Sequence, residues 1–112
     1  MQNYEHGVRC LEADGKLTVY LEGDIDHHSA KTIRARIDTK LFLIRPQELV
    51  LDLARVNFMD SAGLGLILGR YTKAAELGVH FRLVNPNDQI RKILDLVGLE
   101  RLIPISSCMS KL

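Results

Sequence analysis

The stretch FMDSAGLGLILGR, residues 58–70, decides how the rest of this chain is interpreted. An acid and a serine stand directly before a run of apolar residues, which is the pattern of a helix start. Inside that run lie Gly63, Gly65 and Gly69. Each glycine in a helix interior destabilises it by roughly 1 kcal/mol relative to alanine. The sequence therefore predicts a helix that begins near Ser61. The three glycines in it are unfavourable for a helix, so their presence requires an explanation in packing or function.

Strands and helices are expected to alternate outward from this stretch. Asp14-Gly15 is a hairpin turn signal, and the apolar run ELVLDL is typical of a strand in a parallel or mixed sheet. Helices alternating with strands predict a layered α/β fold. The expected elements are strands at 8–12 and 17–22, a helix capped by Asp26 or Ser29, a strand at 48–53, a turn at 54–60, a helix from Ser61, a strand at 79–83, a helix from 85–88 to Gly98, and an edge strand within 102–105.

Apolar spacing predicts which helix faces are buried. Residues recurring every three or four positions form one stripe of a helix, and that stripe faces the core. The expected core stripes are Ala30, Ile33, Ile37 and Leu41 on the first helix, and Leu64, Ile67, Leu68, Tyr71 and Ala75 on the second.

Composition limits the class of protein. The chain has 112 residues, a net charge of +1, 46% hydrophobic residues and no tryptophan. These values predict one folded domain and disfavour disorder and nucleic-acid binding. No apolar run approaches the roughly 18 residues of a membrane span, and the N-terminus lacks a signal-peptide pattern. Cys10 and Cys108 form neither a CxxC nor a metal-ligand spacing, so we expect a reduced, cytoplasmic protein.

The polar start of the glycine-containing helix has four interpretations. Asp60 or Ser61 caps the helix, and the glycines serve packing alone. A phosphate cradle is disfavoured because DSAGLG matches neither GxxxxGK[ST] nor GxGxxG. A nucleophilic serine is disfavoured because Met59 stands where GxSxG requires glycine, and no histidine spacing completes a triad. In the fourth, Ser61 receives a phosphate, and Ala62 and Gly63 let another protein approach. The residues alone do not decide between the first and the fourth.

Two separated segments resemble one known family. NFMDSAGLGLILGRY (57–71) resembles the phosphorylation-site segment of bacterial anti-sigma factor antagonists, members of the STAS domain family. GDIDHHSA (23–30) resembles the segment at which their first helix begins. The resemblance extends over about residues 8–105 and is strongest to the antagonists of the sporulation sigma-F system. Either segment alone is weak evidence, but the two together at this separation are specific.

The resemblance implies a fold. We expect a single STAS-type α/β domain over residues 1–112, with a small mixed sheet of four to five strands and helices packed against it. Residues 8–105 would form its core. Relatives often end in a further helix, whereas the tail at 106–112 is short and has no apolar stripe, so that helix is expected to be missing or only a turn.

The resemblance also implies a switch rather than an enzyme. An unmodified antagonist binds an anti-sigma factor that is also a serine kinase, and this binding releases the sigma factor. The kinase then phosphorylates the antagonist on a serine that matches Ser61 here, and a separate PP2C-type phosphatase resets it. Ala62 replaces the second serine of many relatives, which leaves one acceptor in the motif. A general-stress antagonist is the alternative within the family. A small serine hydrolase and an anion-transporter domain are poorer alternatives.

The same resemblance implies which residues contact the partner. Without it, Asp26, His27 and His28 would only cap a helix and face solvent, and Arg70 would be either a solvated charge or a docking residue. Neighbouring histidines diverge on a helix, so no metal site is expected, and no cofactor is expected either. The implied partner contacts around Ser61 are Asp24, Asp26, His27, His28, Asn57, Met59, Asp60, Ala62, Gly63, Leu64, Gly65 and Arg70.

Overall fold

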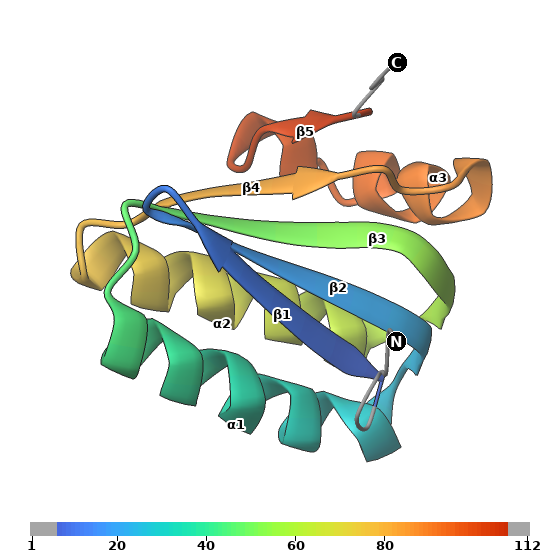
Figure 1. The fold of residues 1–112 in the computed structure, drawn as a ribbon. Coiled ribbons are helices and arrows are strands. Elements are labelled where there is room, and N and C mark those ends of the chain that lie inside the picture. Colours follow the sequence, from blue (N-terminus) through green and yellow to red (C-terminus); the bar gives the residue numbers. More distant parts are fainter. Residues whose placement is uncertain (1–6, 108–112) are drawn as a thin grey trace.

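Strands and helices alternate along the chain, as Figure 1 shows. In order they are β1 (Val8–Ala13), β2 (Lys16–Ile25), α1 (His27–Ile44), β3 (Glu48–Met59), α2 (Ser61–Glu76), β4 (His80–Val84), α3 (Asp88–Leu96), the 3-10 helix η1 (Leu99–Arg101) and β5 (Ile105–Ser106). The computed structural model describes residues 7–107. The strands form one sheet in the order β1-β2-β3-β4-β5, with β1 antiparallel to β2 and the other neighbours parallel. The predicted α/β fold with a small mixed sheet is confirmed.

The strand β3 is longer than the sequence predicts. The turn expected at 54–60 is wrong, because β3 continues to Met59 and pairs with β2 along its second half. Likewise β2 continues to Ile25, so Asp24 lies in a strand and not in the loop before α1. Register shifts interrupt the β2–β3 pairing between Tyr20 and Asp24. Such irregularities break the alternation of buried and exposed residues, which removes the sequence signal of a strand.

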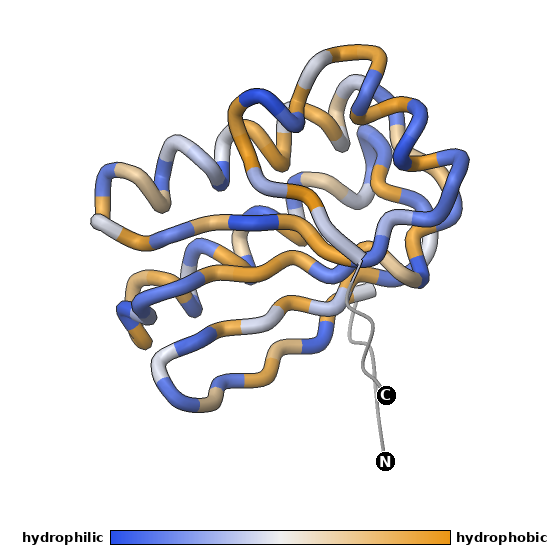
Figure 2. Tube along the Cα trace, turned by 90° about the horizontal axis from the view of Figure 1, so that it is seen from above, coloured by the Kyte–Doolittle hydropathy of each residue, from blue (hydrophilic) through white to orange (hydrophobic). Residues whose placement is uncertain are grey.

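Two helices cover one face of the sheet. In Figure 1, α1 and α2 lie side by side beneath β1, β2 and β3. Figure 2 looks onto the opposite face, where no helix of the described chain crosses β1 and β2. Of the predicted stripe of α1, Ile33, Ile37 and Leu41 are buried, and Ala30 is half-buried. These side chains pack with Leu17 and Leu49 of the strands in one hydrophobic core.

The core face of α2 differs from the predicted stripe. Leu66, Ile67 and Ala74 are buried, whereas Leu68 and Ala75 are exposed. Only Ile67 of the expected stripe is fully buried. The helix is apolar around most of its circumference, so its periodicity does not single out one face. A second apolar side of α2 therefore remains at the surface.

The last part of the described chain also departs from expectation. The edge strand predicted at 102–105 is instead the two-residue β5 (Ile105–Ser106), and η1 precedes it. Gly98 adopts a left-handed conformation, which ends the predicted helix and leads into η1. Residues 108–112 lie outside the described residues, and so does the predicted absence of a final helix. No helix within 7–107 is both long and apolar enough to span a membrane.

Candidate functional site

Two segments far apart in sequence meet at one edge of the sheet. The parallel strands β2 and β3 end together, with Ile25 opposite Met59. The backbone N–H of Asp60 donates to the carbonyl oxygen of Ile25, with a distance of 3.4 Å between nitrogen and oxygen. The helices α1 and α2 begin just after these strand ends, so their N-termini are neighbours (Figure 1). The segments that carry the family resemblance therefore form one continuous surface.

An aspartate caps each of these two helices. Oδ1 of Asp26 accepts hydrogen bonds from the backbone N–H groups of His28 at 2.9 Å and Ser29 at 3.1 Å. The hydroxyl of Ser29 in turn accepts from the backbone N–H of Asp26 at 3.0 Å, which completes a capping box. The hydrogen bond from Ser29, with a smaller contribution from His28, lowers the pKa of Asp26 below its ordinary value. Asp26 is therefore held in its charged form.

Asp60 fills the N-terminus of α2. Its Oδ1 accepts from the backbone N–H groups of Ala62 at 2.8 Å and Gly63 at 3.1 Å. The anion that the first turn of a helix favours is therefore already present as a carboxylate. A phosphate on the neighbouring Ser61 would find these two N–H groups occupied.

Ser61 is exposed at the first position of α2. Its hydroxyl makes no hydrogen bond to any residue between 7 and 107, the histidines included. His27 and His28 lie edge to face with ring centroids 5.7 Å apart, and no group of three or more metal-ligating side chains occurs in the described chain. The described surroundings of Ser61 thus offer an accessible hydroxyl without a general base in hydrogen-bond contact.

The predicted site residues fall into three groups by burial. Asp24, His27, His28, Asn57 and Gly65 are exposed, and Asp26, Asp60, Ala62 and Leu64 are half-buried. These nine residues lie either at the strand ends beside Ser61 or in the first turns of α1 and α2. All of them are accessible enough to contact a partner protein. Three others are buried in the isolated chain: Met59, Gly63 and Arg70.

The buried members of the set have structural roles. Met59 lies under the first turn of α2, where a Cβ added to Gly63 would stand 2.5 Å from its Cγ. Arg70 pairs with Asp38 of α1, with Nε 3.1 Å from Oδ1, so the interpretation as a solvated charge is wrong. Burial lowers the pKa of the Arg70 guanidinium, and the charge of Asp38 partly offsets that effect. We therefore do not place these three side chains in the contact surface around Ser61.

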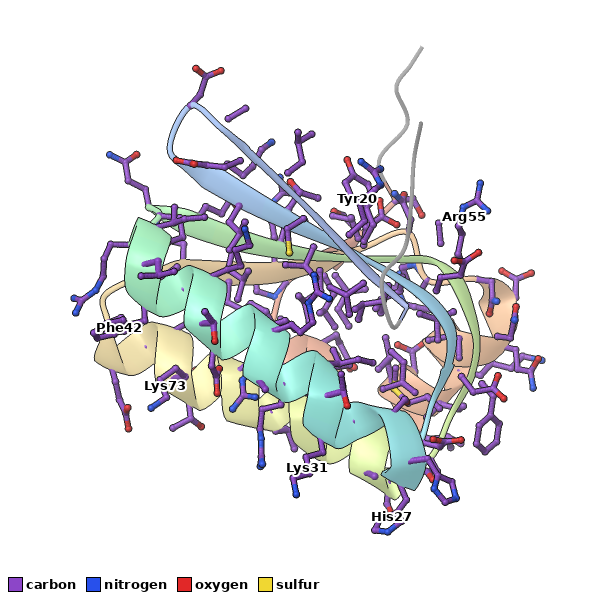
Figure 3. All side chains as sticks on the ribbon, turned by 60° about the horizontal axis from the view of Figure 1, so that its bottom comes forward. Tyr20, His27, Lys31, Phe42, Arg55 and Lys73 are labelled. Atoms are coloured by element: carbon purple, nitrogen blue, oxygen red, sulfur yellow. The ribbon has the colours of Figure 1, made fainter. Side chains whose placement is uncertain are left out.

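A groove between α1 and α2 was not predicted. It has a volume of about 620 Å³ and begins beside the edge that carries Ser61, with His27 and Ala62 among its lining residues. Gly65 and Gly69 on α2 line it opposite Lys31 of α1. Figure 3 shows His27 at the N-terminal end of α1 and Lys31 farther along, at the side that faces α2. The four-residue spacing of the two glycines was the available sequence signal, because such residues share one helix face.

Comparisons with known proteins agree with this geometry. The family model described as the STAS domain matches residues 8–111. The anti-sigma F factor antagonist of Paenibacillus polymyxa is 36% identical over 91 residues, which cover 81% of this chain and 78% of that protein. The anti-sigma-B factor antagonist of Bacillus subtilis (strain 168) is 30% identical over 102 residues, which cover 89% of this chain and 90% of that protein.

Two solved structures of one antagonist are similar over most of their length. The unphosphorylated form of the anti-sigma factor antagonist SpoIIAA has a TM-score of 0.79 and 28% identity, covering 92% of this chain and 89% of that one. The phosphorylated form of Bacillus SpoIIAA has a TM-score of 0.72 and 28% identity, covering 92% of each chain. SpoIIAA, which has this fold, has thus been solved in an unphosphorylated and in a phosphorylated form.

Proposed function

This chain belongs to the STAS domain family, and on that premise we propose that it is an anti-sigma factor antagonist switched by phosphorylation of Ser61. The observation that carries the proposal is the exposed Ser61 at the edge where the two helix N-termini meet. In the unphosphorylated state this edge binds an anti-sigma factor that is also a serine kinase. The sigma factor held by that kinase is then released.

The proposed contact surface follows from exposure. Asp24 and Asn57 extend it along the ends of β2 and β3, and His27 and His28 extend it over the start of α1. The half-buried Asp26, Asp60, Ala62 and Leu64 complete it together with Gly65. Small residues at the first turn of α2 leave the Ser61 hydroxyl open to an approaching active site. The γ-phosphoryl group of ATP is transferred to Oγ, the hydroxyl proton leaves to a base of the kinase, and ADP departs.

The phosphate acts on the complex rather than on the fold. A phosphoserine adds about 1.5 to 2 negative charges at pH 7. It would stand beside the Asp60 carboxylate, whose hydrogen bonds are already committed to Ala62 and Gly63. Charge placed in a desolvated interface without a basic partner is penalised by several kcal/mol, and each 1.4 kcal/mol weakens binding about tenfold. The phosphorylated chain therefore dissociates, and a PP2C-type phosphatase restores the binding form.

Two systems are candidates for the sigma factor. The similarity to the anti-sigma F factor antagonist of Paenibacillus polymyxa, at 36% identity, supports a sporulation role. The similarity to the anti-sigma-B factor antagonist of Bacillus subtilis, at 30% identity, supports the general-stress alternative. We favour the first because of the higher identity. The names of these relatives support a regulatory role over an enzymatic one.

The decisive experiment is intact mass spectrometry after incubation with ATP and a candidate anti-sigma kinase. We expect one added phosphate on the wild type and on the control Ser106→Ala, because Ser106 is an exposed serine in β5, two strands away from the end of β3 that precedes Ser61. The variant Ser61→Ala should gain none. A phosphate that persists on Ser61→Ala would place the acceptor elsewhere and contradict the proposal.

A further inference from the structure

Two of the three helix glycines have no internal role in the described chain. A Cβ added to Gly65 or Gly69 would meet no atom within 4 Å, in contrast to Gly63. Alanine at either position would therefore fit and would favour the helix. Their place on the wall of the groove between α1 and α2 gives them a different use, because glycine leaves that wall without a side chain.

The groove also holds a charge whose hydrogen bonds are incomplete. Arg70 lines it, exposes only 7% of its side chain and has Nε and Nη1 buried without a hydrogen-bond acceptor among the described residues. The Asp38 carboxylate is close enough for an ion pair, but its angle to Nε is too poor for a hydrogen bond. A buried guanidinium with unpaired N–H groups is costly unless an acceptor arrives.

Further positive charge surrounds Arg70. Lys31 and Arg34 of α1 line the same groove, are exposed and form no salt bridge within residues 7–107. Asp26 and Asp60 precede lining residues of the groove in sequence, and their carboxylates accept hydrogen bonds from the N–H groups of their own helices. Among the described residues, only the carboxylate of Asp38 forms an ion pair with any of these three cations, which favours an acidic occupant.

We propose that the groove between α1 and α2 receives an acidic segment of a protein partner, whose carboxylate supplies the acceptor that Arg70 lacks. Gly65 and Gly69 let the backbone of that segment approach α2 closely, whereas a side chain at either position would block this approach. This inference deepens the proposed function, since Ala62 and Gly65 belong both to the groove and to the surface around Ser61. The partner would be held at two places, at the serine and along the groove.

The test needs neither kinase nor sigma factor. A short alanine-rich peptide with a central glutamate is titrated into the ¹⁵N-labelled protein, and the matched peptide with glutamine in that place is titrated in parallel. Inorganic phosphate forms a third arm. We expect the glutamate peptide to shift the signals of Gly65, Gly69 and the Arg70 side chain in a saturable way, and the glutamine peptide to bind at least about tenfold more weakly.

Variants show whether the shifts come from the groove. A Cβ at position 69 would meet no atom within 4 Å, so Gly69→Leu should fold, fill the wall of the groove and abolish the shifts. Arg70→Met should abolish them as well, and the control Lys92→Gln, at an exposed lysine of α3, should leave them unchanged. Equal binding of both peptides, or shifts that persist in Gly69→Leu, would overturn the proposal. Saturation by phosphate without saturation by the glutamate peptide would also overturn it, in favour of a free oxyanion.

The two proposals fail separately. If the glutamate peptide leaves the groove signals unchanged while Ser61 is still phosphorylated, the groove assignment is wrong and the switch stands. If Ser61 receives no phosphate while the peptide still binds in the groove, the groove assignment stands and the switch is wrong.

Discussion

Gly63 of α2 packs against the end of β2 so closely that a Cβ at its position would stand 2.6 Å from the carbonyl oxygen of Ile25. Backbone cannot move aside as a flexible side chain can, so Gly63→Ala should destabilise the fold by about 1–3 kcal/mol. The matched variant Gly65→Ala should instead stabilise it by up to about 1 kcal/mol. Urea denaturation followed by circular dichroism measures both. Equal effects of the two substitutions would contradict this account of the helix.

Replacement of Ser61 separates folding from binding. The side chain is exposed and makes no hydrogen bond within the described residues, so Ser61→Glu should change the free energy of unfolding by less than about 0.5 kcal/mol. The added charge beside Asp60 should weaken binding to the anti-sigma factor at least about tenfold. Isothermal titration calorimetry, with Ser106→Glu as the control, measures the affinity. An unchanged dissociation constant would count against charge as the switch.

The cap of α2 can be tested at Asp60. Asp60→Ala removes the acceptor of two backbone N–H groups and should destabilise the fold by about 0.5–2 kcal/mol. Asp60→Asn keeps an acceptor oxygen and should be close to the wild type. Thermal unfolding compares the three proteins. If asparagine proved as damaging as alanine, the hydrogen bonds would not be the source of the stability.

The ion pair between the helices calls for a double-mutant cycle. Asp38→Asn leaves the buried Arg70 guanidinium without its counter-charge and should destabilise the fold by about 1–3 kcal/mol, the smaller end being favoured because Asp38 is 34% exposed. In the background of Arg70→Met the same substitution should have little effect. Chemical denaturation of the four proteins gives the coupling free energy. A coupling near zero would mean that the ion pair does not join α1 to α2 energetically.

The lowered pKa of Asp26 predicts a dependence of stability on pH. Hydrogen bonds from Ser29 and His28 favour the charged carboxylate in the folded state. Its contribution is therefore present above the unfolded pKa of 3.8 and is lost as the pH falls through the lower folded pKa. The difference in melting temperature between wild type and Asp26→Asn should be largest at neutral pH and should narrow in acid. A gap that widens below pH 3.8 would reverse the sign of this argument.

Local patterns predicted most of the fold. The hairpin turn, the core stripe of α1 and the helix start at Ser61 follow from signals within a few residues. The second half of β3 does not follow from such signals, because the register shifts in its pairing with β2 disrupt the alternation of buried and exposed residues. The core side of α2 could not be predicted from local patterns either, since apolar residues and glycines are distributed around most of the helix. Such elements are defined by contacts with distant residues, which a single segment does not reveal.

The candidate site divides in the same way. Its exposed members could be named from the two resembling segments, but the segments do not reveal that Met59 and Gly63 face inward. Nor did any pattern predict the pairing of Arg70 with Asp38, because the partners lie on different helices. Their burial and pairing became visible only once α1 and α2 were placed side by side.

The parallel pairing of β2 with β3 has a consequence for newly made chains. Paired residues such as Leu17 and Leu49 are separated in the sequence by all of α1. Their contact closes a long loop, so it forms late relative to local structure. The edge that carries Ser61 therefore does not exist in a nascent or misfolded chain. A kinase that recognises this edge would not bind chains that have not yet folded. Only folded antagonist molecules would then contribute to the release of the sigma factor.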